Sequence, residues 1–227
     1  MGFSRYLSLA FTALVLGFAQ ITSAQDDGTA YMVTYIEVAP FAADEAAELL
    51  AAYVQESSDA DGNVRFQALQ RIGRPSHFAI LETWSDTEAR DAHVSSRQTE
   101  IFHDTLEALL YSPADVRPHG DLTTAAGGNV GPSGVFAVTH VDVTPNNTEV
   151  AVGLLETLAS ASRNDGGNAR FDVLVQSNRR NHMTVVESWE SPEAQEEHYG
   201  ATHTKSFRAS LFPLSGALYD ERLYRSL

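Results

Sequence analysis

The chain has 227 residues and a formal net charge of −15, because 30 acidic side chains stand against 15 basic ones. This excess of negative charge disfavours DNA, RNA and anionic lipid as partners, since each carries charge of the same sign. The hydrophobic fraction of 43% indicates a folded protein with a core. The chain has no cysteine, which excludes disulfides, thiolate nucleophiles and zinc–thiolate or iron–sulfur sites.

Residues 1–24 have the pattern of a secretory signal peptide. Arg5 precedes an apolar run at residues 7–18, and small residues at 22–24 suit peptidase cleavage before Gln25. The apolar run is too short to span a bilayer comfortably. We therefore expect an exported protein, periplasmic or secreted, with no stable membrane anchor after cleavage. An uncleaved anchor is the alternative.

The chain repeats itself at a constant shift of 105 residues. Residues 31–122 align without a gap on residues 136–227, with about 27 identities in 92 positions, far more than chance gives in a fixed register. Between the copies lies a stretch rich in glycine and small residues, typical of a linker. The sequence thus predicts a first domain at 31–122, a linker at 123–135 and a second domain at 136–227.

Each copy shows the same order of predicted elements: strand, helix, two strands, a helical region and a closing strand. Alternating apolar residues mark the strands, and apolar residues three and four apart mark the helices. Ser191 and Pro192 begin the second helical region of the second copy as N-cap and first-turn residues, and Asp86 holds the N-cap position in the first. In the first copy the elements are expected at residues 31–39, 44–57, 64–71, 77–84, 86–109 and 115–122.

This βαββαβ order is the ferredoxin-like plan of an α+β protein, with an antiparallel sheet covered by helices on one face. The other face of such a sheet is left half exposed. Two copies in one chain can cover these faces with each other. We therefore expect two tandem ferredoxin-like domains that close into one barrel-like internal pseudo-dimer.

Three motifs recur in both copies. A Gly-Asn-x-Arg-Phe segment enters the second strand at 62–66 and 167–171, a Glu-x-Trp segment closes the third strand, and a histidine follows nine residues after that tryptophan. This combination resembles the antibiotic biosynthesis monooxygenase domain of the dimeric α+β barrel superfamily. The resemblance implies cofactor-free oxygenation of quinols, naphthols or other phenolic aromatics, with haem-degrading enzymes and isomerases as further activities among the relatives.

His93 and His198 are the candidate catalytic residues. Their helical positions point the rings toward the sheet, near the tryptophans. A neutral imidazole can remove a phenolic proton near pH 7, and the resulting anion can give an electron to O2. The alternative is a core histidine that is hydrogen-bonded to a backbone carbonyl or to Glu82.

The tryptophans and glutamates of the Glu-x-Trp segments share one face of the third strand. Trp84 and Trp189 could stack on a flat substrate and supply an N–H donor, or belong to the core. Glu82 and Glu187 point into an apolar layer, where a carboxylate is costly unless it is paired. They could orient the histidine or bond to the start of the helix.

The remaining candidate substrate contacts are polar residues of the first and second strands. Tyr35 and its counterpart His140 are expected across the pocket, and their difference suggests that the two sites are not equivalent. Asn63 and Asn168 are interpreted mainly as turn residues that tolerate left-handed backbone angles after glycine, with a substrate contact as the second interpretation.

Haem and metal sites are weakly indicated. Haem-degrading relatives carry a ligand histidine where His103 stands, yet its counterpart is Arg208, and the expected tryptophan and asparagine are missing. No His-x-His pair or His-Glu-x-x-His helix occurs, so no metal and no cofactor are expected. Arg65 and Arg170 point away from Phe66 and are expected to pair with acids or to bind an anionic substrate.

The sequence hypothesis is therefore a cofactor-independent monooxygenase of a small phenolic or quinol-like aromatic compound that uses a histidine base and O2. The alternative is a non-catalytic module of the same fold that binds a small ligand. An isomerase that uses the same histidine cannot be separated from these by sequence.

Overall fold

The computed structural model describes residues 28–227, and the predicted signal peptide lies outside them. The first half contains β1 (Ala30–Glu37), η1 (Pro40–Ala42), α1 (Ala43–Ser57), β2 (Asn63–Arg71), β3 (His77–Trp84), α2 (Thr87–Val94), α3 (Arg97–Glu107) and β4 (Asp115–Thr123). The second half contains β5 (Val135–Asp142), η2 (Pro145–Asn147), α4 (Thr148–Ser162), β6 (Asn168–Gln176), β7 (Arg179–Trp189), α5 (Pro192–Gly200), α6 (Thr202–Leu211), η3 (Phe212–Leu214) and β8 (Asp220–Ser226). Within residues 28–227, no helix combines the length and apolar character needed to cross a membrane.

The eight strands form one closed antiparallel barrel in the order β1-β3-β2-β8-β5-β7-β6-β4. Each half contributes four neighbouring strands, and the halves are joined where β2 pairs with β8 and β4 pairs with β6. Closure pairs the strand edges that two separate sheets would leave open. The predicted pair of ferredoxin-like α+β units in one internal pseudo-dimer is confirmed.

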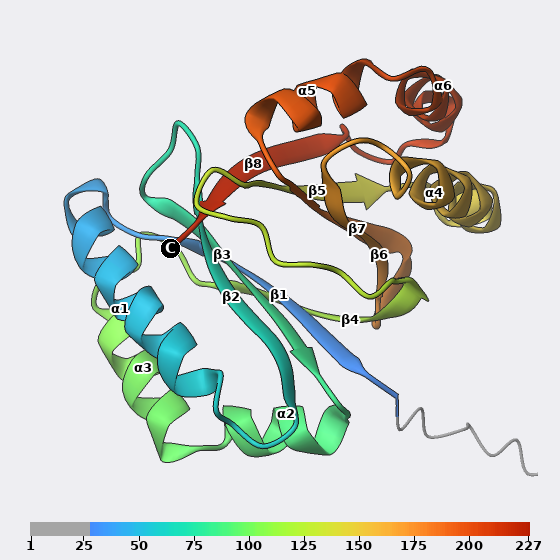
Figure 1. Cartoon of the computed structure of the whole chain (residues 1–227). Helices are drawn as coiled ribbons and strands as arrows, with labels where there is room; N and C mark the ends of the chain where they lie inside the picture. Colours follow the sequence, from blue (N-terminus) through green and yellow to red (C-terminus); the bar gives the residue numbers. More distant parts are fainter. Residues whose placement is uncertain (1–27) are drawn as a thin grey trace, which may run out of the picture.

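The helices of the two halves cover opposite sides of the barrel (Figure 1). Strand residues alternate between two environments. In β1, Ile36 packs under the helices of its own half, whereas Val33 points into the barrel. The interior core draws on both halves and includes Val33, Leu81, Val138 and Val186. The two halves are therefore held together by a shared apolar core as well as by strand pairing.

The predicted helix starts are confirmed by their caps. The Asp86 carboxylate accepts a hydrogen bond from the Ala89 backbone N–H at 2.7 Å, and the Ser191 hydroxyl accepts one from the Ala194 N–H at 3.3 Å. Such caps satisfy N–H groups that have no partner within the helix. They fix where α2 and α5 begin, and both helices carry a candidate histidine.

The turns before β2 and β6 differ from the sequence interpretation. The left-handed residues are Gly62, with φ of 74°, and Gly167, with φ of 76°, while Asn63 and Asn168 already begin the extended strands. The physical reason is space, because a Cβ atom on Gly62 would lie 2.4 Å from the Cβ of Ala89. Glycine is required here by both conformation and close approach.

The segment between β4 and β5 contains no helix or strand and is hydrogen-bonded to one strand of each half. Arg65 donates to the Gly127 carbonyl at 2.9 Å, and the Ala125 N–H donates to the Asp172 carboxylate at 3.1 Å. Asp172 also forms a buried ion pair with Arg170. The expected acidic partner is therefore found for Arg170, on its own strand, whereas Arg65 bonds to the linker backbone.

Candidate functional site

A layer of tryptophan, glutamate and histidine lies between sheet and helices in each half. Trp84 and Trp189 are the last residues of β3 and β7, and their side chains lie on the helix side of the sheet. Helices α2 and α5 carry the histidines that pack on them. The ring centroids of Trp84 and His93 are 4.6 Å apart, and those of Trp189 and His198 are also 4.6 Å apart. The structure thus brings together the histidine and tryptophan that the sequence singled out in each half.

The glutamates of this layer bond to the tryptophans rather than to the helix start. Trp84 donates its indole N–H to Glu82 at 2.9 Å, and Trp189 donates to Glu187 at the same distance. These indole donors are consequently engaged within the protein. Burial raises the pKa of Glu82, and it raises the pKa of Glu187 to about 8, with a further contribution from the charge of Glu221.

His93 lies in an aromatic cluster of the first half. Its Nε2 atom is 2.9 Å from the Tyr53 hydroxyl and 3.4 Å from the Thr99 hydroxyl. Tyr53 stacks on Phe102 with ring centroids 3.7 Å apart. Burial lowers the pKa of His93. The ring is therefore a buried group held by hydroxyls, and its partners are neither the backbone carbonyl nor Glu82 that the alternative interpretation named.

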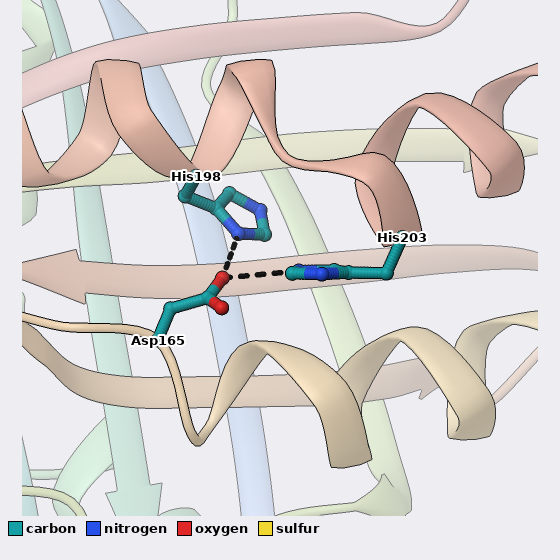
Figure 2. A group of neighbouring side chains, drawn as sticks. All are labelled: Asp165, His198 and His203. Atoms are coloured by element: carbon teal, nitrogen blue, oxygen red, sulfur yellow. Dashed lines mark hydrogen bonds and ion pairs between the residues drawn. The ribbon is translucent and has the colours of Figure 1, made fainter.

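His198 has a different set of partners. Its Nδ1 atom lies 2.7 Å from Oδ2 of Asp165, and the same oxygen is 3.0 Å from Nε2 of His203 (Figure 2). Its Nε2 atom faces the opposite way, 3.8 Å from Oε2 of Glu187. Burial lowers the pKa of His198, while its hydrogen bond to Asp165 acts in the other direction. This histidine is flanked by carboxylates on both sides.

The repeat explains why the two histidines differ. The positions of Asp165 and His203 correspond to Ala60 and Gln98 in the first half. Sequence reasoning missed both residues, although the self-alignment displays them as a carboxylate and an imidazole present in one copy alone. Together with His198 they place three ligand atoms within 4.8 Å of one another, a donor set that could hold a cation, where the sequence had indicated no metal site.

Tyr35 and His140 do not contact this layer, and the prediction of a shared pocket was wrong. Tyr35 pairs with Ala79 and packs against the interior core, on the opposite face of the sheet from Trp84. Its ring lies 4.9 Å from the Arg117 guanidinium. His140 likewise points inward, with Nδ1 3.1 Å from the same guanidinium. Because strand neighbours alternate faces, the first-strand residues on the helix side are Thr34 and its counterpart.

Each half has an open cavity beside its last α-helix, α3 or α6, and the segment that leads into the closing strand, β4 or β8. In the second half it measures about 580 Å³ and includes Arg208, Leu211 and Tyr219 in its wall. The matching cavity of the first half measures about 510 Å³ and includes His103 and Leu106. Neither cavity has a histidine–tryptophan pair in its lining.

The second-half cavity has an arginine guanidinium in its wall. Arg208 forms an ion pair with Glu221 and lies 5.0 Å from the Tyr219 ring centroid. Burial raises the pKa of Tyr219, and the charge of Glu187 acts in the same direction, which links the cavity wall to the His198 layer. His103, Ala114 and Val116 occupy the corresponding positions in the first half.

The asparagines take separate places. Asn63 lines a cavity of about 710 Å³ beside Arg65 and the linker. Asn168 donates its side-chain amide to the Arg170 carbonyl at 3.2 Å, which is a local backbone contact. Neither arrangement joins an asparagine to the histidine of its half through a hydrogen bond. A substrate contact for either residue stays a prediction.

Comparison with known proteins agrees with this architecture. One curated relative, named "Putative monooxygenase YcnE" from Bacillus subtilis (strain 168), is 29% identical over 82 residues, which cover 36% of this chain and 86% of that protein. A single-unit relative of this kind matches one copy of the repeat.

Solved structures match the whole two-unit fold. A monooxygenase-named protein of Fusobacterium nucleatum superposes with a TM-score of 0.81 at 13% identity, covering 88% of this chain and 93% of the other. An anthrone oxidase-like protein gives a TM-score of 0.69 at 13% identity, covering 89% and 92%. At such identities these likenesses concern the fold alone.

The family pattern described as "Antibiotic biosynthesis monooxygenase" matches residues 29–105 and again residues 134–210. The two matches include both tryptophan, glutamate and histidine layers. The chain therefore belongs to the antibiotic biosynthesis monooxygenase family and carries its domain twice.

Proposed function

We propose that the second half binds a small phenolic or quinol-like compound in its cavity and oxygenates it with O2, without an organic cofactor. The observation that carries this proposal is the open cavity of about 580 Å³ with Arg208 and Tyr219 in its wall. An apolar cavity with a few convergent polar groups suits a small aromatic ligand with hydroxyl groups. The family and the monooxygenase-named relatives support the reaction class.

The base assigned to this reaction is His198. The hydrogen bond from Nδ1–H to Asp165 leaves Nε2 as the acceptor, and the carboxylate stabilises positive charge on the ring. His93 has hydroxyl partners in place of Asp165. Trp189 is buried outside the cavity lining and supports the His198 ring, with its indole N–H engaged by Glu187.

The chemistry needs no external reductant. Loss of the phenolic proton makes the ring electron-rich enough to reduce O2. One oxygen atom then enters the ring carbon and the other leaves as water with two substrate hydrogens. A naphthol would give a naphthoquinone with one O2 consumed, whereas simple autoxidation of a quinol gives hydrogen peroxide.

The test measures oxygen uptake and product with 1-naphthol and related quinols, for the wild type, His198→Ala and His93→Ala. We expect the wild type to consume one O2 per naphthol without peroxide, His198→Ala to lose at least about 100-fold in rate, as is usual for a general base, and His93→Ala to keep the activity once folded. The proposal fails if the wild type consumes no oxygen above background, or if His198→Ala keeps the full rate.

The first half supports a second candidate function, a non-catalytic binding or structural unit. Both halves bury their histidine and tryptophan outside the two cavities, but His93 has hydroxyl partners and lacks the carboxylate that would support a base. In this proposal the first half binds at most an apolar ligand beside His103 and completes the barrel. A second equivalent of naphthol bound per chain, and lost in a folded His103→Ala protein, would reveal such a site.

We also propose that the chain is exported, on the pattern of residues 1–24. Fractionation of cells that express the full chain, with mass measurement of the mature N-terminus, tests this. A start at Gln25 in the exported fraction is expected, and retention of an intact chain in the cytoplasm contradicts it.

A further inference from the structure

We propose that Asp165, His198 and His203 form a binding site for one divalent transition-metal ion, of the kind that zinc and cobalt represent. The three side chains come from separate elements. Asp165 lies in the turn before β6, His198 in α5 and His203 in the first turn of α6. They converge on one point at the edge of the helix layer (Figure 2).

The distances suit a metal ion with a small adjustment. Asp165 Oδ2 is 2.7 Å from His198 Nδ1 and 3.0 Å from His203 Nε2. Tetrahedral zinc with bonds of about 2.0–2.2 Å separates its ligand atoms by about 3.3 Å. The two contacts of Asp165 therefore have to open by a few tenths of an ångström to admit the ion, and the two imidazole nitrogens lie within 4.8 Å of each other.

The donor types favour a transition metal over magnesium or calcium. Two imidazole nitrogens and one carboxylate oxygen suit zinc, cobalt, nickel or copper, whereas magnesium and calcium prefer oxygen donors. The side chains of Asp165 and His203 are 23% and 29% exposed, so an ion can enter from solvent. Three protein ligands leave a fourth position for water.

The Nε2 atom of His198, which would not bind the metal, also has polar neighbours. When Nδ1 binds a metal, the neutral ring carries its proton on Nε2. That nitrogen faces Glu187, whose Oε2 atom lies 3.8 Å away. The Thr204 hydroxyl is closer, at 3.4 Å, and acceptors behind a ligand histidine orient the ring and strengthen metal binding.

The first half shows that the fold does not need these residues. It builds the same turn, the same pair of helices and the same histidine–tryptophan contact with Ala60 and Gln98 at the positions of Asp165 and His203. A purely structural role for the cluster would have to apply to one copy of a duplicated framework alone. A ligand specific to the second half accounts for the difference.

One consequence rests on the proposed function. A metal on Nδ1 places the proton on Nε2, so His198 can no longer accept a proton from a phenol. The metal-loaded protein is then the inactive form, and the ion regulates the site.

The experiment titrates the full chain, free of any polyhistidine tag, with Zn²⁺ and Co²⁺ by calorimetry and by metal analysis after dialysis. We expect one ion per chain, no comparable binding of Mg²⁺ or Ca²⁺, and Co²⁺ absorption bands of a nitrogen–oxygen site. Asp165→Asn and His203→Gln should each weaken binding by about 100-fold or more, the upper range for loss of a supporting residue. His103→Gln, in the first half, serves as the matched control and should bind like the wild type.

A second experiment introduces the missing ligands into the first half, so that the test does not depend only on variants that remove a ligand. Ala60→Asp combined with Gln98→His should create a second site and raise the count to two ions per chain. The proposal is overturned if the wild type binds no Zn²⁺ at micromolar concentrations, or if folded Asp165→Asn and His203→Gln proteins bind as the wild type does. Zinc binding that leaves oxygen uptake intact contradicts the inhibitory consequence, and absence of uptake with or without zinc contradicts the proposed function alone.

Discussion

The two halves of the barrel keep one framework and surround its histidine with different chemistry. Both stack the ring on a tryptophan at 4.6 Å and bond that tryptophan to a glutamate. Each ring also has the equivalent threonine hydroxyl at 3.4 Å, but His93 meets the Tyr53 hydroxyl whereas His198 meets the Asp165 carboxylate. Duplication thus preserved the packing unit, and a few neighbouring positions decide what each histidine can do.

Inside the barrel, too, equivalent positions of the two halves carry different side chains. Tyr35 in the first half corresponds to His140 in the second, and Tyr224 in the second corresponds to His119 in the first. Each half therefore contributes one inward tyrosine and one inward histidine at these positions. The histidine lies on the closing strand in the first half and on the first strand in the second half, so the titratable groups of the interior do not follow the symmetry of the strands.

The largest expected effect is acid destabilisation through these two inward histidines. Burial lowers the pKa of His119 and of His140 to about 4, and the Arg117 charge acts in the same direction. In the unfolded chain these two histidines bind protons near pH 6.5. Their contribution to the free energy of unfolding is therefore complete above that pH and is lost as the pH falls toward 4. We expect a loss of about 3 kcal/mol per histidine over this window.

Urea unfolding between pH 7 and pH 4 measures this loss. His119→Gln and His140→Gln should each reduce the loss between pH 7 and pH 4 by the contribution of one histidine, about 3 kcal/mol. Tyr35→Phe is the control, since it changes the interior without removing a histidine. Equal pH profiles for the wild type and both histidine variants would show that these rings do not titrate as their burial implies.

A second prediction compares the arginines at equivalent positions of β2 and β6. Arg170→Met leaves the buried Asp172 carboxylate without its ion-pair partner, and such losses cost about 3–5 kcal/mol. Arg65→Met removes a hydrogen bond to the Gly127 carbonyl and should cost about 1 kcal/mol. Chemical denaturation of both variants measures the difference, and similar losses at the two positions would contradict it.

The fold was largely predictable because its signals are local and repeated. Two copies of one pattern fixed the strand and helix order, and the caps at Asp86 and Ser191 fixed where two helices begin. The same alternation that predicted the strands also placed Tyr35 on the face of Val33, inside the barrel. The assignment of Tyr35 to the pocket rested on the family resemblance, and the alternation of this strand places its side chain on the other face.

The site was predictable in part, because only some of its contacts follow from local periodicity. The helical position of His93 and His198 relative to the sheet predicted their contact with tryptophan. The contact between Asp165 and His203 depends on how the turn before β6 approaches the junction of α5 and α6, which no local pattern encodes. The hydroxyl of Tyr53 likewise reaches His93 from a separate helix.

Substitution of the turn glycines should destabilise the protein by an intermediate amount, and by a similar amount in the two halves. Gly62→Ala and Gly167→Ala each force a left-handed alanine whose Cβ lies 2.4 or 2.6 Å from an alanine Cβ of the following helix. Conformational cost and overpacking together should destabilise each variant by about 2–4 kcal/mol. Gly73→Ala is the matched control, because its φ is 78° and nothing lies within 4 Å of the added Cβ.

Thermal or urea unfolding of the three glycine variants decides the point. Gly73→Ala should lose about 1 kcal/mol, the conformational cost alone. A loss at Gly73 equal to that at Gly62 would mean that the helix does not press on the turn. Unequal losses at Gly62 and Gly167 would mean that the framework itself has diverged between the halves.

The smallest expected effect concerns the hydroxyl that distinguishes the first half. Tyr53→Phe removes the hydrogen bonds to His93 and Thr99 while keeping the stack on Phe102, and should destabilise the protein by about 1–2 kcal/mol. Tyr31→Phe is the control, because that hydroxyl reaches only Thr124, at 3.4 Å. Oxygen uptake with naphthol should be unchanged in the folded Tyr53→Phe protein, since the proposed chemistry belongs to the second half. A folded Tyr53→Phe protein with normal stability but altered uptake would instead make the first half a working site, and the hydroxyl around His93 part of its chemistry.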